Sequence, residues 1–170
     1  MKFPQHPGCT SCILHEQPGI NNIGIATIQL DDSMPPTRST PFMLCIGQNP
    51  GYLEDQHGIP FIGKSGIIFR GGFITPTGEP TLNERIGERI PGLFLDGADL
   101  REQATVYVTN AVRCWTLTNA RPGWKANTKP CFPHTMADIV RIQHRHRHCD
   151  RNIILCLGRP ASEAVLKLLL

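Results

Sequence analysis

The chain has 170 residues, of which 40% are hydrophobic and 18% charged, and a formal net charge of +3. This length suits a single domain with its own core, and the composition excludes an intrinsically disordered chain. The sequence has neither an apolar run of membrane-spanning length nor the apolar stretch of a signal peptide near its start. We therefore expect one domain over residues 1–170 in a soluble, cytoplasmic protein.

The cysteines are the first chemical signal along the chain. There are seven, an odd number, and structural disulfides are unusual in a reducing compartment. Cys9 and Cys12 form a C-x-x-C pair. Such a pair fits a redox couple, half of a zinc site or half of an iron–sulfur site. Metal or cluster ligation is therefore the favoured explanation.

Residues 24–30 alternate in the manner of a strand, and residues 31–41 form a polar loop with three prolines. Residues 42–46 are a short apolar run, which predicts a buried strand. A polar loop at the carboxyl end of such a strand is where open α/β sheets bind ligands.

The loop that follows this strand has the composition of a binding site. Gly47 and Gly51 lack a Cβ and allow backbone to approach a ligand closely. Pro50 fixes its own φ and removes one N–H donor. Phe61 offers a flat apolar face for a ring. Together these residues predict a pocket for a planar, hydrogen-bonding molecule.

The second half of the chain predicts two more strands and two helices. Residues 67–102 contain many breaks, with a short helix expected from Thr81. Residues 105–109 predict a strand, residues 115–133 an irregular stretch, and residues 153–157 a third buried strand. A final helix is expected from residue 161, with Pro160 in its first turn. The other helix is predicted over residues 135–148, with Met136, Ile139, Val140 and Gln143 on one side.

This alternation of strands and helices predicts an α/β protein. The expected architecture has three layers, α/β/α, with a central and mostly parallel sheet covered by helices on both faces.

A basic segment lies near the end of the predicted helix. It could face phosphates, and a solvated helix face explains the pattern equally well. His144 and His148 would share one helix face, but a DNA-facing or solvated stripe is favoured over a metal site for the histidines. The segment contains Arg141, His144, Arg145, His146, Arg147, His148 and Arg151.

Four motifs, spread from Cys9 to Leu166, carry most of the functional information. They are Cys9-x-x-Cys12; Gly47-Gln48-Asn49-Pro50-Gly51 with Glu54-Asp55 and Gly58-x-Pro60-Phe61-x-Gly63-Lys64-x-Gly66; Tyr107-Val108-Thr109-Asn110-Ala111-Val112-Arg113-Cys114 with Cys131 following; and Leu155-Cys156-Leu157-Gly158 with the helix after it.

In this order the motifs resemble the uracil-DNA glycosylase superfamily, most closely its iron–sulfur type, often called family 4. The resemblance implies a [4Fe–4S] cluster, with zinc as the alternative because thiolate spacing alone does not separate the two. Cys45 and Cys156 are interpreted as buried small hydrophobes, and Cys149 has no assigned role. The implied cluster ligands are Cys9, Cys12, Cys114 and Cys131.

The resemblance implies hydrolysis of the N-glycosidic bond between uracil and deoxyribose in DNA, and thus a role in base excision repair. Backbone N–H groups from Gly47 to Asn49 would donate to a uracil carbonyl, while Phe61 would stack on the ring. Asn110 would read the edge of the base. Gln48 and Asn49 depart from the usual family 4 motif, and Gly-x-Asn-Pro-Gly is similar to the mismatch-specific branch, where the asparagine orients the attacking water. In some relatives an aromatic side chain at the position of Gly51 excludes the methyl group of thymine, and the glycine in this chain provides no such barrier.

One family motif, His-Pro-Ser, does not occur in this sequence. We expect the domain to be incomplete at its C-terminal end, with a protein partner or a fused region supplying the motif. The alternative function is a catalytically inactive iron–sulfur module that binds DNA or proteins, as part of a larger replication or repair protein. A redox protein built on Cys9 and Cys12 is a third, weaker alternative.

Overall fold

The protein is described here by a computed structural model, which covers residues 9–30, 37–64, 66, 73–74, 80–81, 104–116 and 121–169. The predicted helix after Thr81 lies largely outside these residues. Thr81 itself belongs to a short strand. The elements in chain order are η1 (Ile13–Glu16), β1 (Ile28–Gln29), β2 (Phe42–Gly47), α1 (Tyr52–His57), β3 (Phe73–Ile74), β4 (Pro80–Thr81), β5 (Thr105–Asn110), α4 (Arg121–Arg145), β6 (Ile153–Cys156) and α5 (Arg159–Leu169).

Four strands form the main sheet in the order β1-β5-β2-β6. Strand β2 pairs in parallel with β5 and with β6, and β1 pairs with β5 in the antiparallel sense. All residues of β2 and β5 are buried, as their apolar and β-branched sequences predict. The predicted α/β fold with a mostly parallel sheet is confirmed, although β1 is shorter than the pattern in residues 24–30 suggested.

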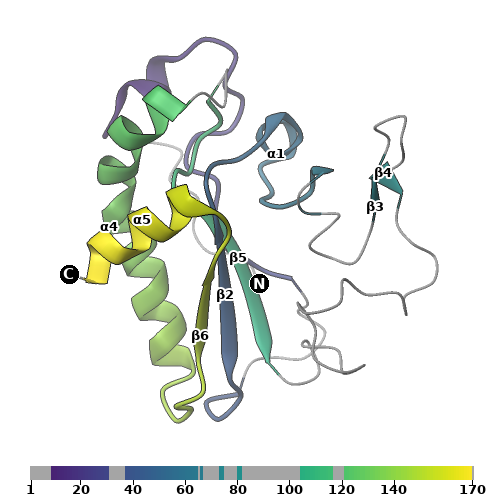
Figure 1. The fold of residues 1–170 in the computed structure, drawn as a ribbon, viewed down its shortest axis with the longest axis vertical. Coiled ribbons are helices and arrows are strands. Elements are labelled where there is room, and N and C mark those ends of the chain that lie inside the picture. Colours follow the sequence, from purple (N-terminus) through teal and green to yellow (C-terminus); the bar gives the residue numbers. More distant parts are fainter. Residues whose placement is uncertain are drawn as a thin grey trace.

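The residues of β2 alternate between two apolar clusters, one on each face of the sheet. Phe42, Leu44 and Ile46 pack with residues of α4 and α5, which lie together on one face (Figure 1). Met43 and Cys45 pack on the other face with Phe61, Val106 and Val108. Burial on both faces fixes the sheet between these layers, so the carboxyl end of β2 is held in a well-packed setting.

Helix α4 begins at Arg121, so the prediction of an irregular stretch over residues 115–133 is wrong for its second half. Pro130 and Pro133 lie inside the helix. Proline lacks an N–H donor and crowds the preceding turn, which is why the sequence indicated a break. Tertiary packing overrides this preference, because Cys131 is 4% exposed and packs with Leu14 and Val112.

The predicted inward face of α4 is also partly wrong. Ile139 is buried, but Val140 is 55% exposed and Gln143 is exposed. Ile142 and the polar Asp138 face inward instead. Hydrophobic periodicity cannot find a buried carboxylate, which here is paired with a buried cation described below.

Strand β6 lies at the edge of the described sheet, and Ile153 is 56% exposed, so the prediction of a third fully buried strand is wrong. Helix α5 is confirmed, with Pro160 in its first turn. Within the part of the chain that the structure describes, no helix is both long and apolar enough to span a membrane.

Candidate functional site

The candidate site begins where β2 and β5 end. Gly47 and Asn110 are register partners at the carboxyl ends of these strands. The pairing continues into the loops, because the N–H of Ala111 donates to Gly47 O and that of Val112 to Gln48 O, both at 2.9 Å. Two loops far apart in the sequence are therefore held side by side.

Only glycine fits at position 47, because neighbouring side chains leave no space for a Cβ atom. A Cβ there would lie 2.5 Å from Asn110 Oδ1 and 3.0 Å from Phe61 Cζ. The amide of Asn110, 5% exposed, and the ring of Phe61, 6% exposed, thus close over the end of β2.

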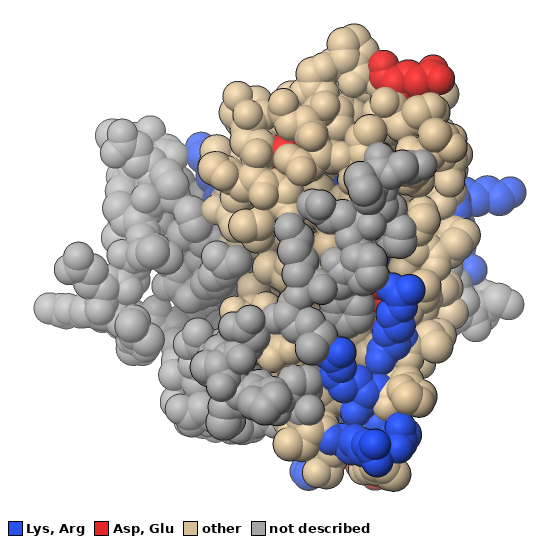
Figure 2. Space-filling model, turned by 180° about the vertical axis from the view of Figure 1, so that it is seen from behind, with Lys and Arg blue, Asp and Glu red and all other residues tan. Residues whose placement is uncertain are grey.

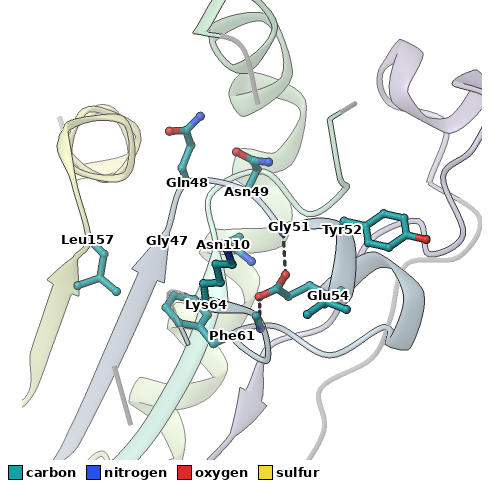
Figure 3. A pocket seen from close by; sticks show the side chains of 12 residues that line it. Gly47, Gln48, Asn49, Gly51, Tyr52, Glu54, Phe61, Lys64, Asn110 and Leu157 are labelled. Atoms are coloured by element: carbon teal, nitrogen blue, oxygen red, sulfur yellow. Dashed lines mark hydrogen bonds between the residues drawn. The ribbon is translucent and has the colours of Figure 1, made fainter. Parts of the chain in front are cut away.

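A cavity of about 580 Å³ opens at these strand ends (Figure 3). This volume is within the range of small-molecule sites. Pro50 is not among the lining residues, but the structure brings together the six residues predicted to bind the substrate or the attacking water: Gly47, Gln48, Asn49, Gly51, Phe61 and Asn110. The remaining lining residues are Tyr52, Leu53, Glu54, Gly63, Lys64 and Leu157.

Glu54 holds the cavity wall together. Its Oε2 accepts the N–H of Gly51 at 3.0 Å, and its Oε1 accepts the N–H of Gly63 at 2.8 Å (Figure 3). The side chain is 7% exposed, so these bonds also satisfy a buried carboxylate. Sequence reasoning included Glu54 in a motif but missed this role. Glu54 lies three residues after Gly51, in the first turn of α1, and this spacing is the sequence signal for a side chain that caps the start of a helix.

Asp55 joins the N-terminal segment to the same loop. It is fully buried and accepts the backbone N–H groups of Asn21 and Asn22 at 2.9 and 3.0 Å. The side-chain amide of Asn21 donates to it as well, at 2.9 Å. Residues 21–22 are thereby fixed against helix α1, next to the cavity loop.

Phe61 adopts an unusual backbone conformation, with a φ of +60°. Such a conformation is strained for a bulky residue, and strain of this kind gathers at functional sites. Packing of the ring with Met43, Cys45, Val106 and Val108 offsets the strain. A Cβ on Gly66 would meet the Phe61 carbonyl group at 1.8 Å, so the chain returns past Phe61 only because residue 66 is glycine.

Asn49 and two further residues complete the cavity. The Nδ2 of Asn49 donates to Pro50 O at 2.8 Å and lies 3.4 Å from Thr116 Oγ1, which fixes the plane of the amide. Lys64 is the only cation among the described lining residues. Tyr52 is 58% exposed at the rim and contacts Trp115 edge to face, with ring centroids 5.5 Å apart.

The four cysteines predicted as cluster ligands lie in one neighbourhood. Cys114 and Cys131 are buried in a small cluster, and Cys12 packs against it. The pKa of the Cys114 thiol is raised to about 12 and that of Cys131 to about 11, mainly by burial, with smaller contributions from the nearby Cys12 and Cys9. The N–H of Gly24 donates to Cys114 Sγ at 3.3 Å.

The chemistry of this donor set fits a thiolate-bound group. Four cysteine sulfurs are the ligands that iron–sulfur clusters and structural zinc prefer, and N–H groups directed at sulfur are typical of such sites. Cys9 Sγ also lies 3.6 Å from His134 Nε2. Among the described residues, no group of three or more His, Cys, Asp or Glu side chains has metal-binding geometry.

A buried ion pair connects the cysteine region to the end of β5. Arg113, 1% exposed, donates to Asp138 Oδ2 at 2.9 Å and to Thr27 Oγ1 at 2.8 Å. Burial lowers the pKa of Arg113, and Asp138 opposes that shift. Arginine nevertheless remains charged in proteins. Asn110 and Cys114 thus flank a segment that is tied to helix α4, a link that sequence reasoning missed.

Comparison with known proteins decides the family. The family model of the uracil DNA glycosylase superfamily matches residues 37–169. The chain belongs to the uracil DNA glycosylase superfamily. No curated protein sequence matches it. The superfamily match includes the cavity loops, Cys114 and Cys131, and it begins after Cys9 and Cys12.

The basic segment of this superfamily member does not border the cavity. His146 is fully buried, so the interpretation of three histidines as one surface stripe is wrong. His144 and His148 are exposed. Tyr107 is hydrogen-bonded by Arg145, and its hydroxyl lies 3.0 Å from His146 Nε2. Nδ1 of His146 contacts Thr40 O at 2.6 Å, which assigns the proton to Nδ1.

These contacts place the segment at the amino end of β2. Asn152 Oδ1 accepts the N–H of Phe42, the first residue of the strand, at 3.2 Å. Gly47 and the cavity lie at the other end. The sequence could not reveal this separation, because it depends on the direction of the strands.

Proposed function

We propose that the chain is a uracil-DNA glycosylase of the iron–sulfur, family 4 type, which hydrolyses the N-glycosidic bond of uracil in DNA. The observation that carries the proposal is the closure of Asn110 and Phe61 over Gly47, inside a cavity of small-molecule size. Superfamily membership supports it.

The cavity has the groups that a uracil ring requires. A base must leave the helical stack before an enzyme can act on its glycosidic bond. The ring would stack on Phe61, while the amide of Asn110 accepts from uracil N3–H and donates to O4. Cytosine presents the inverse pattern and would leave buried polar groups unpaired, so it is rejected.

Bond cleavage makes the sugar positive and the departing uracil negative. Backbone N–H groups of the loop from Gly47 to Asn49 stabilise the negative ring oxygen. The charge of Lys64, on the cavity lining, favours the same anion. Asn49 orients the attacking water. An amide is not a strong general base, so catalysis is slow.

The four cysteines would hold a [4Fe–4S] cluster, with zinc as the alternative. A thiolate-bound cluster would supply a fixed crosslink in this part of the protein. It would join the N-terminal segment at Cys9 and Cys12 to the loop after β5 at Cys114 and to helix α4 at Cys131. Because the loop after β5 also follows Asn110, the crosslink would support the cavity.

A second candidate is an inactive iron–sulfur module that binds DNA or a protein. Both oxygens of Glu54, the one carboxylate among the described lining residues, accept backbone N–H groups. That carboxylate is therefore not available as a general base. A partner polypeptide or a fused region that supplies a His-Pro-Ser motif would restore activity.

One experiment separates the two candidates. The purified protein is incubated with uracil-containing single-stranded and duplex oligonucleotides, and alkali then cleaves any abasic product. The glycosylase proposal predicts strand cleavage at uracil that is lost in Asn49→Ala. Absence of product at high protein concentration, together with intact binding of the same oligonucleotides, would favour the inactive module.

A further inference from the structure

A cluster of arginines lies at the end of the sheet opposite to the cavity. We name it the basic turn and define it as residues 145–151 with Arg38, whose carbonyl accepts the N–H of His148 at 3.0 Å. The connection from α4 to β6 lies at the lower end of the molecule in Figure 1, and Lys and Arg side chains gather at that end in the view from behind (Figure 2).

Hydrogen bonds of His146 and Asn152 hold the basic turn in place. His146 is buried between Thr40 and Tyr107, as described above. Asn152 donates to Cys149 O at 2.8 Å and accepts from Phe42 at 3.2 Å. A surface that is already ordered loses little conformational entropy when it binds a partner.

Within the part of the chain that the structure describes, no carboxylate forms an ion pair with Arg38, Arg147 or Arg151. Arg38, Arg147 and Arg151 are exposed. Asp150 is the only acidic residue in the sequence between Asp138 and Glu163. The other nearby arginines have structural partners, since Arg145 bonds Tyr107 and Arg141 lies 3.6 Å from Asp138.

We propose that the basic turn binds the phosphate backbone of a nucleic acid segment other than the one whose base occupies the cavity. Strand β2 spans the two sites, and six residues of strand cover roughly 17–20 Å. Arginine pairs with phosphate through two parallel N–H donors, which favours a phosphate partner over a simple counter-ion role. This inference does not depend on removal of uracil.

The test is binding of a fluorescent oligonucleotide without uracil, followed by anisotropy at several salt concentrations. The variant Arg147→Gln with Arg151→Gln is compared with Lys129→Gln with Lys167→Gln, which removes the same charge from exposed positions on α4 and α5. Loss of two phosphate contacts should weaken binding and reduce the slope of log K against log salt by about 1.4 on single strands. The control pair should change neither value.

Two results would overturn the proposal. Equal oligonucleotide binding by both double variants would make the basic turn a solvated surface. Loss of binding to labelled polyglutamate in the arginine variant, with oligonucleotide binding retained, would assign the surface to an acidic protein. Uracil release is measured separately, so failure of the glycosylase proposal would leave this result unaffected.

Discussion

Gly47 and Asn110 face each other across β2 and β5, with no room for a side chain on the glycine. The carbonyl of Gly47 also accepts the N–H of Ala111, the residue after Asn110, at 2.9 Å. The strand register therefore sets the geometry of the cavity directly, and the proposed contacts to uracil depend on it.

Gly47→Ala should abolish uracil release while the protein still folds. The new methyl group would displace the Asn110 amide and the Phe61 ring, at a cost of about 1–3 kcal/mol in the free energy of unfolding. Single-turnover cleavage and urea unfolding measure the two effects. Near wild-type cleavage by a folded variant would contradict the assigned role of this contact.

Glu54→Gln should destabilise the protein by roughly 1–3 kcal/mol, because one buried backbone N–H would meet an NH₂ group in place of an oxygen. The matched control is Glu163→Gln, which removes the charge of an ion pair with the exposed Arg159. Both variants are compared by urea unfolding. Equal stability of the two would show that the bonds to Gly51 and Gly63 contribute little.

Asn110→Asp should erode the preference for uracil over cytosine. A carboxylate only accepts hydrogen bonds, so it loses the donor to uracil O4 and can accept from the cytosine amino group. The ratio of cleavage rates on matched uracil and cytosine oligonucleotides measures the change. An unaltered ratio in an active variant would remove Asn110 from base recognition.

The stability of the protein should fall on acidification because of His146. Burial lowers the pKa of this side chain from its ordinary value of 6.5. The unfolded chain then binds a proton more readily than the folded one, so the free energy of unfolding decreases as the pH falls through 6.5. His146→Gln should flatten this decrease, measured by urea unfolding between pH 5 and 8, roughly the range in which histidine titrates. His144→Gln, at an exposed position, should retain it.

Cys114→Ser should prevent binding of the proposed [4Fe–4S] cluster. Purified without air, the wild-type protein is expected to be brown, with iron and sulfide, and the variant colourless. Cys45→Ser is the control, because Cys45 is buried in the sheet among other residues. A colourless wild-type protein that contains zinc would select the alternative metal, and a protein without either would contradict the ligand assignment.

Particular residues show what the sequence could predict and what it could not. Residues 42–46 and 105–109 are apolar and β-branched, so both central strands were predicted correctly, and the cavity loop followed from its glycines. The sequence indicated no helix through Pro130 and Pro133, because packing around Cys131 outweighs their local preference. A pattern of hydrophobic residues could not identify Asp138 as buried, since its partner Arg113 lies far away along the chain.

Long-range relationships were equally hidden in the cavity and at the basic turn. Glu54 was visible as part of a motif, but its second bond, to Gly63, depends on the path of the loop. His146 looked like its neighbours His144 and His148, although it packs against Phe42 and Tyr107. In the turn after α4, His146 is buried whereas Arg147 and His148 are exposed, a difference that a sequence of repeated Arg and His does not reveal.

The most direct test of the central claim is detection of free uracil. Wild-type protein in excess over a single-stranded uracil oligonucleotide is sampled over time, and released uracil is quantified by mass spectrometry beside Gly47→Ala. The proposed site predicts slow release of about one uracil per oligonucleotide by the wild type, and none by the variant. Equal release by both proteins, or none by a wild type that binds the oligonucleotide and contains the proposed cluster, would contradict the claim that this cavity removes uracil.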